Sequence, residues 1–259
     1  MGMGNFISVI SHGHAALIKE LNVLSKLAIS NTVIIKCNKE SDVVALEGYC
    51  KKNNIHLITD NYGLGFGANN NLVFNYCRKN LGLKAEDYFI VMNPDLEIDT
   101  YELKKLNCYV LENASKLSTI NLYKNEEKTV SDDAIRKYPK MGDFFLSLVL
   151  KKNRSKYNKT LIEKPTEVDW AAGSFLMFQA DHYQQLGGFD EKYFMYCEDI
   201  DICYRSSLLK HKPIYYPDVT AVHYAKHANR SFLSKHFFWH LKSALLFLAM
   251  RYKNPIKIN

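Results

Sequence analysis

The stretch Tyr88-Phe-Ile-Val-Met-Asn-Pro-Asp95 is the most informative part of the sequence for the fold. Its apolar run is too short for a buried helix, and Asn-Pro-Asp is typical turn chemistry, so the run predicts a buried strand that ends in a polar loop. Three earlier runs rich in β-branched residues have the same character, at Phe6–Ile10, Thr32–Lys36 and Ile55–Ile58. We therefore predict four short buried strands in the first 95 residues.

Helical patterns separate these runs. Helices are predicted over about Ala15–Leu27 and Asp42–Lys52, and from a glycine-spaced loop at 60–71 through Arg78. Strands that alternate with helices build parallel βαβ units, so the sequence predicts an α/β fold with a mostly parallel sheet flanked by helices.

The loops after the strands are the candidate site, because open parallel sheets bind ligands at the carboxyl ends of their strands. These loops begin at Ser11, Asn38, Asp60 and Asn93.

The second half is less regular. A loop-to-strand transition is predicted within 168–178, a short helix over Asp181–Leu186 that ends at Gly187-Gly188, and a strand over Pro213–His223. An amphipathic helix with basic groups is predicted over Arg230–Tyr252.

The composition is that of a folded domain, with 47% hydrophobic and 24% charged residues in 259. No apolar run is long enough for a membrane span, and we expect no signal peptide. The six cysteines are scattered without a CxxC motif, which favours buried thiols over disulfides or zinc.

The net charge of +7 is unevenly distributed. Residues 210–259 carry +8 and residues 136–164 carry +7, which leaves −8 for the remainder. An acidic body with two basic segments indicates an anionic partner.

Asp95 projects beyond its strand, where a diphosphate and its divalent metal could lie, because hard cations bind carboxylate and phosphate oxygens. An Asx turn explains Asn93-Pro-Asp95 equally well. The series Gly63, Gly65, Gly67 is neither a Walker A loop nor a G-x-G-x-x-G fingerprint, and a helix-capping turn is its simplest explanation.

Glu198-Asp199-Ile-Asp201 places carboxylates beside aromatic residues, which raises carboxyl pKa values toward those of a general base. A solvated helix start is the alternative. His223 ends a strand and could bind a metal, whereas His227, His236 and His240 lack the Glu of an H-E-x-x-H zinc motif and are assigned core or surface roles.

These motifs, taken in order, resemble those of family 2 glycosyltransferases, in particular the bacterial rhamnosyltransferases of O-antigen and cell-wall polysaccharide synthesis. The matching segments span nearly the whole chain and are Ser11–His14, Asn38, Asn61–Asn70, Asn93–Asp95, Trp170–Ser174, Gly188–Glu191, Phe194–Asp201, His223–Ser231 and Trp239–Ser243.

The resemblance implies a GT-A fold with a Rossmann-like, mostly parallel central sheet and a C-terminal amphipathic helical extension. It further implies a catalytic domain over 1–228, with a nucleotide-sugar-binding half at 1–100 and an acceptor-binding half at 101–228, followed by a basic helix at 229–259. The implied reaction is an inverting transfer from a nucleotide sugar, with Mg²⁺ or Mn²⁺ as cofactor.

The resemblance also assigns roles to residues. Asp199 is implied as general base, with Glu198 as competitor, and Asp95 and His223 as metal ligands. The implied nucleotide-sugar site comprises Ser11, His12, Asn38, Asn61, Gly65, Gly67, Asn70, Asn93, Asp95, Gly173 and Ser174. The implied acceptor site comprises Trp170, Asp201 and Arg205.

Two departures from the family pattern concern the nucleotide. Cys37 precedes Asn38 at a position where the family usually has Asp. The carboxylate that usually contacts the nucleobase of the donor is therefore missing from this chain. Asn93 stands in place of an aspartate, which leaves Asp95 as the carboxylate ligand of that loop.

By this resemblance the expected donor is dTDP-L-rhamnose and the expected acceptor is a polyprenyl-diphosphate-linked saccharide in O-antigen or lipopolysaccharide synthesis. Another nucleotide sugar, or a non-catalytic nucleotide-sugar or polysaccharide-binding module, is the alternative. The basic segments, with Trp239 and nearby Phe and Leu, suit an anionic membrane surface at the inner face of the bacterial cytoplasmic membrane. No nucleic-acid-binding signature is present.

Overall fold

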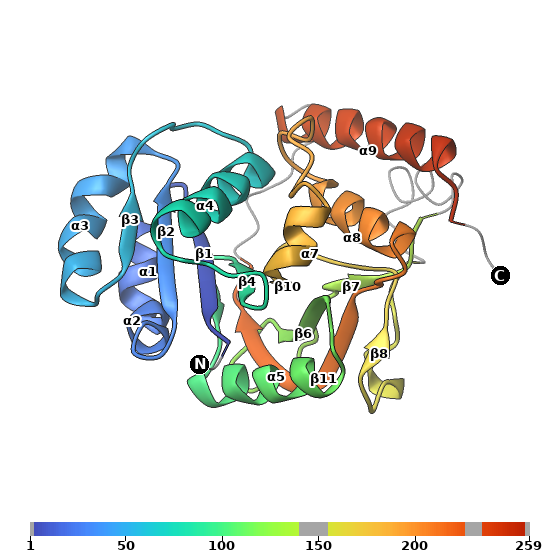
Figure 1. Ribbon diagram of the computed structural model, residues 1–259, viewed down its shortest axis with the longest axis horizontal. Helices are drawn as coiled ribbons and strands as arrows, with labels where there is room; N and C mark the ends of the chain where they lie inside the picture. Colours follow the sequence, from blue (N-terminus) through green and yellow to red (C-terminus); the bar gives the residue numbers. More distant parts are fainter. Residues whose placement is uncertain (1–2, 140–154, 226–234, 257–259) are drawn as a thin grey trace.

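The computed structural model describes residues 3–139, 155–225 and 235–256 (Figure 1). Its strands are β1 (Asn5–Ser11), β2 (Thr32–Cys37), β3 (His56–Ile58), β4 (Tyr88–Met92), β5 (Leu96–Glu97), β6 (Leu117–Tyr123), β7 (Ile135–Arg136), β8 (Thr166–Glu167), β9 (Trp170–Ala171), β10 (Phe175–Gln179) and β11 (Ile214–His223). Its α-helices are α1 (Ala15–Leu21), α2 (Val23–Leu27), α3 (Val43–Lys52), α4 (Phe66–Asn80), α5 (Thr100–Glu112), α7 (Ala180–Gln185), α8 (Glu198–Leu208) and α9 (Lys235–Lys253).

The main sheet has two halves of different character. In its first half β3, β2, β1 and β4 lie side by side and all run parallel. β1, β2 and β4 are buried on both faces, which explains their mainly apolar sequences, whereas β3 at the edge is only partly buried. The predicted parallel unit is therefore present.

The second half of the sheet is mixed. β10 lies between β4 and β6 and runs antiparallel to both, while β6 and β11 are parallel. The sheet is thus less uniformly parallel than we predict, because β10 begins at the edge of the sheet where β4 ends and therefore runs in the opposite direction. The predicted fold class, α/β with helices around a central sheet, is confirmed.

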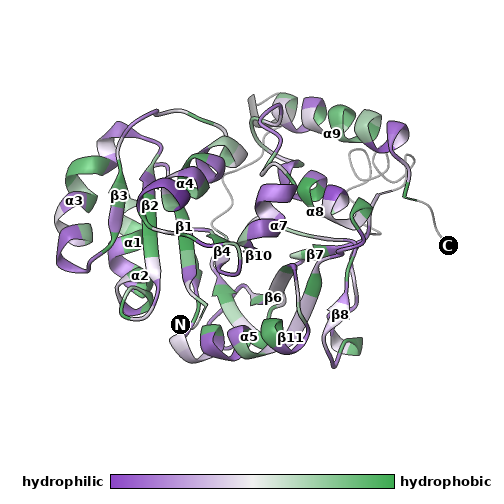
Figure 2. Cartoon of the chain, in the orientation of Figure 1, coloured by the Kyte–Doolittle hydropathy of each residue, from purple (hydrophilic) through white to green (hydrophobic). Residues whose placement is uncertain are grey.

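Alternate residues of the central strands point to opposite faces of the sheet and pack into two separate hydrophobic cores. In β1, Ile7 and Val9 face the core under α1, α2, α3 and α5. Phe6 and Ile10 face the other core, under α4, α7 and α8. Figure 2 shows the central strands as mainly hydrophobic and the outer faces of the helices as more hydrophilic.

Several predicted elements differ in detail. The helix predicted over residues 15–27 is broken into α1 and α2 at Asn22, whose φ of 49° is left-handed. Residues 96–131, for which we predict no element, contain β5, α5 and β6. The apolar stretch at 144–150, and the first residues of the helix predicted from residue 230, lie outside the described residues.

The C-terminal helix α9 packs on α8 (Figure 1). The buried Phe247 ring lies edge-on to Tyr204 of α8 at 5.8 Å, and the Ser243 hydroxyl donates to the Met195 carbonyl at 2.9 Å. Among the helices of the described residues, none is both long and apolar enough to cross a bilayer.

Gly67 fixes a close contact between α4 and the loop before α8. A Cβ at this position would lie 2.6 Å from the Phe189 Cβ, so a methyl group would force the two segments apart. Gly48, in the exposed middle of α3, has open space where its Cβ would be.

We therefore predict opposite effects of two identical substitutions. Gly67→Ala lowers the free energy of unfolding by about 1–3 kcal/mol through overpacking. Gly48→Ala raises it by about 0.5–1 kcal/mol because alanine is the better helix former. Urea denaturation of both variants measures the difference, and a neutral Gly67→Ala variant would contradict the packing role.

Candidate active site

A cleft of about 430 Å³ opens at the carboxyl ends of β1, β2 and β4. It contains residues from each predicted strand-end loop and from the C-terminal helix. The lining residues are Ile10, His12, His14, Asn38, Gly63, Leu64, Phe66, Asn69, Met92, Asn93, Pro94, Asp95, Phe194, Met195 and Trp239. Of the residues assigned to the nucleotide-sugar site, this set includes His12, Asn38, Asn93 and Asp95.

Ser11 supports the first loop from behind the cleft. It is fully buried, and its hydroxyl donates to the Asp42 Oδ2 at 2.5 Å. The same oxygen accepts from the Gly13 amide at 2.7 Å. Asp42 thus fixes the loop that carries His12 and His14.

Asn38 clamps the glycine-spaced loop. Its side-chain amide donates to the Leu64 carbonyl at 2.8 Å, and its side-chain oxygen accepts from the Leu64 amide at 2.9 Å. Both polar ends of the side chain are therefore occupied by Leu64. Cys37 is fully buried, and burial raises the pKa of its thiol to about 11.

The other residues of the glycine loop that were assigned to the nucleotide-sugar site, Asn61, Gly65, Gly67 and Asn70, are not among the residues that line the cleft. Asn70 is buried and its side-chain oxygen accepts from Ser8 at 2.7 Å. Gly65 lies against the Phe194 carbonyl, which also accepts from the Phe66 amide at 3.2 Å. Asn61 is exposed, and its left-handed φ of 53° makes the turn that precedes this loop. The loop and its helix start are held by protein groups, which agrees with the helix-capping interpretation.

Asp95 and His223 meet at the base of the cleft, because β11 pairs with β5 so that His223 lies opposite Leu96. The His223 Nε2 is 3.4 Å from the Asp95 Oδ1, and its Nδ1 is 2.7 Å from the Asp132 Oδ2. Asn93 contributes its side-chain nitrogen at 3.3 Å from Nε2.

The charges of this group are coupled. Burial disfavours the imidazolium, but the hydrogen bonds to Asp132 and Asp95 outweigh it and raise the pKa of His223 to about 9. For the same reason the pKa values of Asp95 and Asp132 fall below their ordinary range, although burial acts in the opposite direction.

This arrangement fits a divalent metal that is shared with a substrate. Asp95 offers an oxygen and His223 a ring nitrogen, and a carboxylate on the far nitrogen is the usual support of a metal-binding histidine. In the described ranges no three or more His, Cys, Asp or Glu side chains gather to hold a metal by themselves. Mg²⁺ or Mn²⁺ with one or two protein ligands takes its other ligands from phosphates and water.

Glu198 and Asp199 begin α8, after Tyr196 and Cys197, which both have left-handed φ angles. The Asp199 Oδ2 accepts from the Gly173 amide at 3.2 Å. Glu198 is 7% exposed, and its Oε2 has no hydrogen-bond partner within the described structure.

Burial governs both carboxyl groups. It raises the pKa of Glu198, and the charge of Asp199 raises it further. Burial also raises the pKa of Asp199, although the Ile200 and Gly173 amides and the charge of Arg136 oppose the rise. Asp199 is the more accessible of the two, so the geometry favours it as the group that meets a substrate.

Gly173 and Ser174 connect Asp199 to the cleft. The Ser174 carbonyl accepts from the Asn93 amide at 3.0 Å, and a Cβ on Gly173 would lie 3.0 Å from the Phe66 ring. Asn93 and Phe66 both line the cleft. Asp199 therefore lies immediately beside it.

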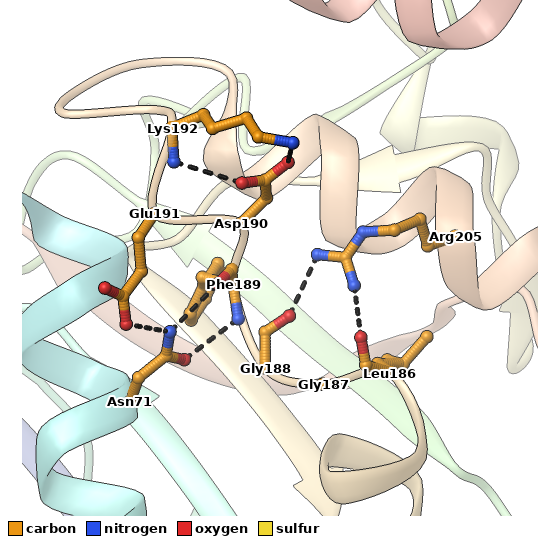
Figure 3. Close-up of a pocket in the computed structure, with 9 residues that line it drawn as sticks. All are labelled: Asn71, Leu186, Gly187, Gly188, Phe189, Asp190, Glu191, Lys192 and Arg205. Carbon is orange, nitrogen blue, oxygen red and sulfur yellow. Dashed lines mark hydrogen bonds and ion pairs between the residues drawn. The ribbon is translucent and has the colours of Figure 1, made fainter.

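Arg205, which was assigned to the acceptor site, does not line the cleft. Its Nε donates to the buried Asp201 carboxylate at 2.8 Å, and its two outer nitrogens donate to the Leu186 and Gly188 carbonyls at 2.6 and 2.9 Å. Arg205 lines a second hollow of about 440 Å³, in which Asn71 holds the backbone of Phe189 (Figure 3). Trp170 is near Asp199 but is not among the residues that line the cleft.

Sequence reasoning missed several residues of this site. Asp132 lies in a polar segment with no local signal, and only the fold brings it to His223. The rings of Phe194 and Trp239 pack at a tilt with their centroids 4.9 Å apart, and both residues line the cleft. Their aromatic character is visible in the sequence, but their contact is not.

Comparison with known proteins identifies the class of this site. No family model matches the chain. The chain is 38% identical over 253 residues to rhamnosyltransferase WbbL of Escherichia coli (strain K12), which covers 95% of this chain and 93% of that protein. It is 37% identical over 90 residues to the N-acetylglucosaminyl-diphospho-decaprenol L-rhamnosyltransferase of Mycobacterium tuberculosis (strain ATCC 25618 / H37Rv), a match that spans 35% of this chain and 29% of that protein.

Solved structures agree on the fold. The mannosyltransferase PcManGT from Pyrobaculum calidifontis, solved with GDP-Man and Mn²⁺, superimposes with a TM-score of 0.62 at 12% identity. The match covers 98% of this chain and 65% of that one, so this chain spans about two thirds of the larger enzyme.

The fold and the site define a glycosyltransferase of the GT-A type. More particularly, the chain belongs to the family 2 glycosyltransferases and is close to the rhamnosyltransferases.

The buried Glu198 predicts a pH-dependent stability difference. Because its pKa is raised on folding, the folded state loses stability as the pH rises above the ordinary glutamate pKa of about 4.3, and the loss is complete above the raised pKa. Glu198→Gln removes this loss. We expect the variant to exceed the wild type in Tm at pH 8 by about 2–4 °C per kcal/mol recovered, and to match it near pH 4. A constant difference across this range would mean that Glu198 does not titrate as its burial requires.

Proposed function

We propose that this glycosyltransferase is an inverting, metal-dependent enzyme that transfers L-rhamnose from dTDP-L-rhamnose to a hydroxyl of a polyprenyl-diphosphate-linked saccharide. The observation that carries the proposal is the position of Asp199. The Gly173 amide holds its carboxylate, and the next residue, Ser174, is bonded through its carbonyl to Asn93 in the lining of the cleft that also contains Asp95. A base at one side of a donor cleft and a diphosphate site at its floor suit a single displacement.

In this reaction Asp199 accepts the proton of the acceptor hydroxyl. The hydroxyl oxygen forms a bond to the anomeric carbon of the donor sugar from the face opposite the diphosphate. The bond from that carbon to the diphosphate oxygen breaks at the same time, and the electron pair leaves with the nucleoside diphosphate. The sugar is therefore transferred with inversion at its anomeric carbon.

Asp95 and His223 would hold the divalent metal, and Asp132 would orient the imidazole through its Nδ1. When bound, the metal neutralises the negative charge of the donor diphosphate. Asn93 contributes a polar amide beside them.

The relatives support the choice of donor and acceptor. WbbL of E. coli is named a rhamnosyltransferase, and the M. tuberculosis relative is named for rhamnosyl transfer with an N-acetylglucosaminyl-diphospho-decaprenol. We extend this chemistry to the present chain as a proposal. Another nucleotide sugar is the alternative donor.

The exposed face of α9 supports a membrane surface as a further partner. Phe238, Leu245 and Tyr252 recur every seven residues and are 55%, 56% and 85% exposed. Seven residues are almost two helical turns, so these side chains form one stripe, and Lys242 and Lys253 are exposed beside it. Apolar groups flanked by lysines suit the boundary of an anionic bilayer, which we propose to be the inner face of the bacterial cytoplasmic membrane.

The activity test uses a panel of nucleotide sugars with a lipid-diphosphate-linked saccharide. We expect transfer from dTDP-L-rhamnose above all others, its loss in EDTA, and its recovery with Mn²⁺ or Mg²⁺. Asp199→Asn should lose about a hundredfold or more in kcat while it still binds donor.

Glu47→Gln is the matched control for Asp199→Asn, because it also replaces one carboxylate with an amide, at an exposed position in α3. This variant should retain activity. Activity undiminished by EDTA would remove the metal from the proposal. A normal kcat in Asp199→Asn would transfer the role of base to Glu198, and donor binding without any transfer would indicate a non-catalytic module.

The membrane test removes the apolar stripe. The double variant Leu245→Ser/Tyr252→Ser should bind vesicles that contain phosphatidylglycerol about tenfold or more weakly. The reason is that two apolar side chains are no longer transferred from water into the bilayer when the protein binds. The control Ile29→Ser/Val44→Ser removes two exposed apolar side chains far from α9, one in the turn after α2 and one in α3, and should bind as the wild type does. Equal binding of both double variants in co-sedimentation would count against the proposal.

A further inference from the structure

We propose that Arg136, held against Trp170 beside the catalytic cleft, binds the diphosphate of the lipid-linked acceptor. This inference rests on the proposed function and names the residue that recognises the anionic part of the acceptor. Trp170, the acceptor residue implied by the family resemblance, then acts as the platform that positions the arginine.

The backbone fixes Arg136 next to Trp170. β7 and β9 form a separate two-stranded sheet in which Arg136 lies directly opposite Trp170. The guanidinium carbon is 5.5 Å from the centroid of the Trp170 ring, and the Arg136 Nε donates to the Asp133 carbonyl at 2.9 Å. The Trp170 ring nitrogen donates to the Lys137 carbonyl at 3.1 Å, which fixes the ring as well.

The same small sheet leads to the general base. Trp170 and Ala171 form β9, which packs against α8, and two residues further on the Gly173 amide donates to Asp199. The charge of Arg136 is also felt at Asp199, where it opposes the rise in pKa that burial causes. Arg136, paired with Trp170 of β9, is therefore close to the proposed base.

The neighbouring acids do not neutralise this arginine. The Asp133 carboxylate pairs with Lys156 at 2.5 Å, and the Asp169 carboxylate accepts from the Tyr138 amide at 2.8 Å. In the part of the chain that the structure describes, Arg136 has no ion pair with any acidic side chain. The Arg136 guanidinium is half-buried on an aromatic face and has no carboxylate partner there. Such a group is suited to bind an anionic group of a ligand.

The chemistry of the acceptor identifies this anion. The donor diphosphate belongs at Asp95, on the floor of the cleft. The M. tuberculosis relative is named for an acceptor with one sugar on its lipid diphosphate, and in such an acceptor the diphosphate is on the same ring as the reacting hydroxyl. With an acceptor of this kind the diphosphate lies about one sugar ring from Asp199. Arginine binds phosphate oxygens with two parallel N–H groups, which fixes orientation as well as charge.

The first test measures binding without turnover. Farnesyl diphosphate, which carries the lipid diphosphate but no sugar, is titrated into wild type, Arg136→Gln, Arg136→Lys and Lys137→Gln in a calorimeter. We expect Kd to rise by about tenfold or more in Arg136→Gln, to recover in part in Arg136→Lys, and to stay unchanged in Lys137→Gln, which loses the charge of the residue that directly follows β7. Equal weakening in Arg136→Gln and Lys137→Gln would overturn the proposal, because it would show a general charge effect.

The second test compares two acceptors, a lipid-diphosphate-linked saccharide and an octyl glycoside of the same sugar. In Arg136→Gln we expect the ratio of kcat/KM for the charged acceptor over the neutral one to fall about tenfold or more, with KM for the donor unchanged. An unchanged ratio, or a rise in the donor KM, would overturn the proposal. A wild type that transfers to neither acceptor would contradict the proposed function instead, and the calorimetric result would still decide the role of Arg136.

Discussion

The pairing of β10 with β4 is the constraint on which the site depends. The two strands are antiparallel and Phe175 lies opposite Met92, so the residues just before β10 lie beside those just after β4. Gly173 and Ser174 thereby meet Asn93, and the base in α8 is brought to the cleft of the parallel half. Both strands are buried and mainly apolar, and a shift of one residue would turn every apolar side chain of β10 to the opposite face. The packing of the core therefore fixes the distance between Asp199, the proposed base, and the proposed diphosphate site at Asp95.

Sequence patterns could predict the parallel half because its signals are local. Each short apolar run ends in a polar turn, and the geometry of a parallel sheet brings those turns together. Asp95 can be predicted for this reason, since it lies in the turn directly after β4, and His223 can be predicted because it ends the apolar strand β11. Asp132 was not visible, because its place beside His223 depends on the pairing of β6 with β11, far apart in the sequence. The antiparallel entry of β10 is a long-range feature of the same kind.

The asparagines and glycines of the first half show a second limit of sequence patterns. Three residues of the motifs that resemble the family's nucleotide-sugar site contact protein groups in the structure. Asn38 contacts Leu64, Asn70 contacts Ser8 and Gly67 contacts Phe189. Such residues shape the cleft by holding its loops in place, and their spacing alone does not distinguish this role from direct binding. The lining itself consists largely of backbone, histidine and apolar side chains. A buried Cys37 is compatible with this arrangement, because the strand end supplies no side chain to the cleft at that position.

The described parts of the two basic segments contact each other between α9 and the chain that follows β7. The Arg251 guanidinium of α9 donates to the Pro139 carbonyl at 2.6 Å and lies 5.4 Å from the Tyr138 ring, so the chain after β7 is attached to the C-terminal helix. On its inner side α9 also places Trp239 in the wall of the cleft, whereas its exposed stripe faces outward. One helix thus connects a surface suited to lipid with the wall of the catalytic cleft. In the proposed function the lipid chain of the acceptor stays in the bilayer at this stripe. Arg136 lies three residues before the contact of α9 with Pro139, and its guanidinium on the Trp170 ring would then bind the diphosphate of that acceptor.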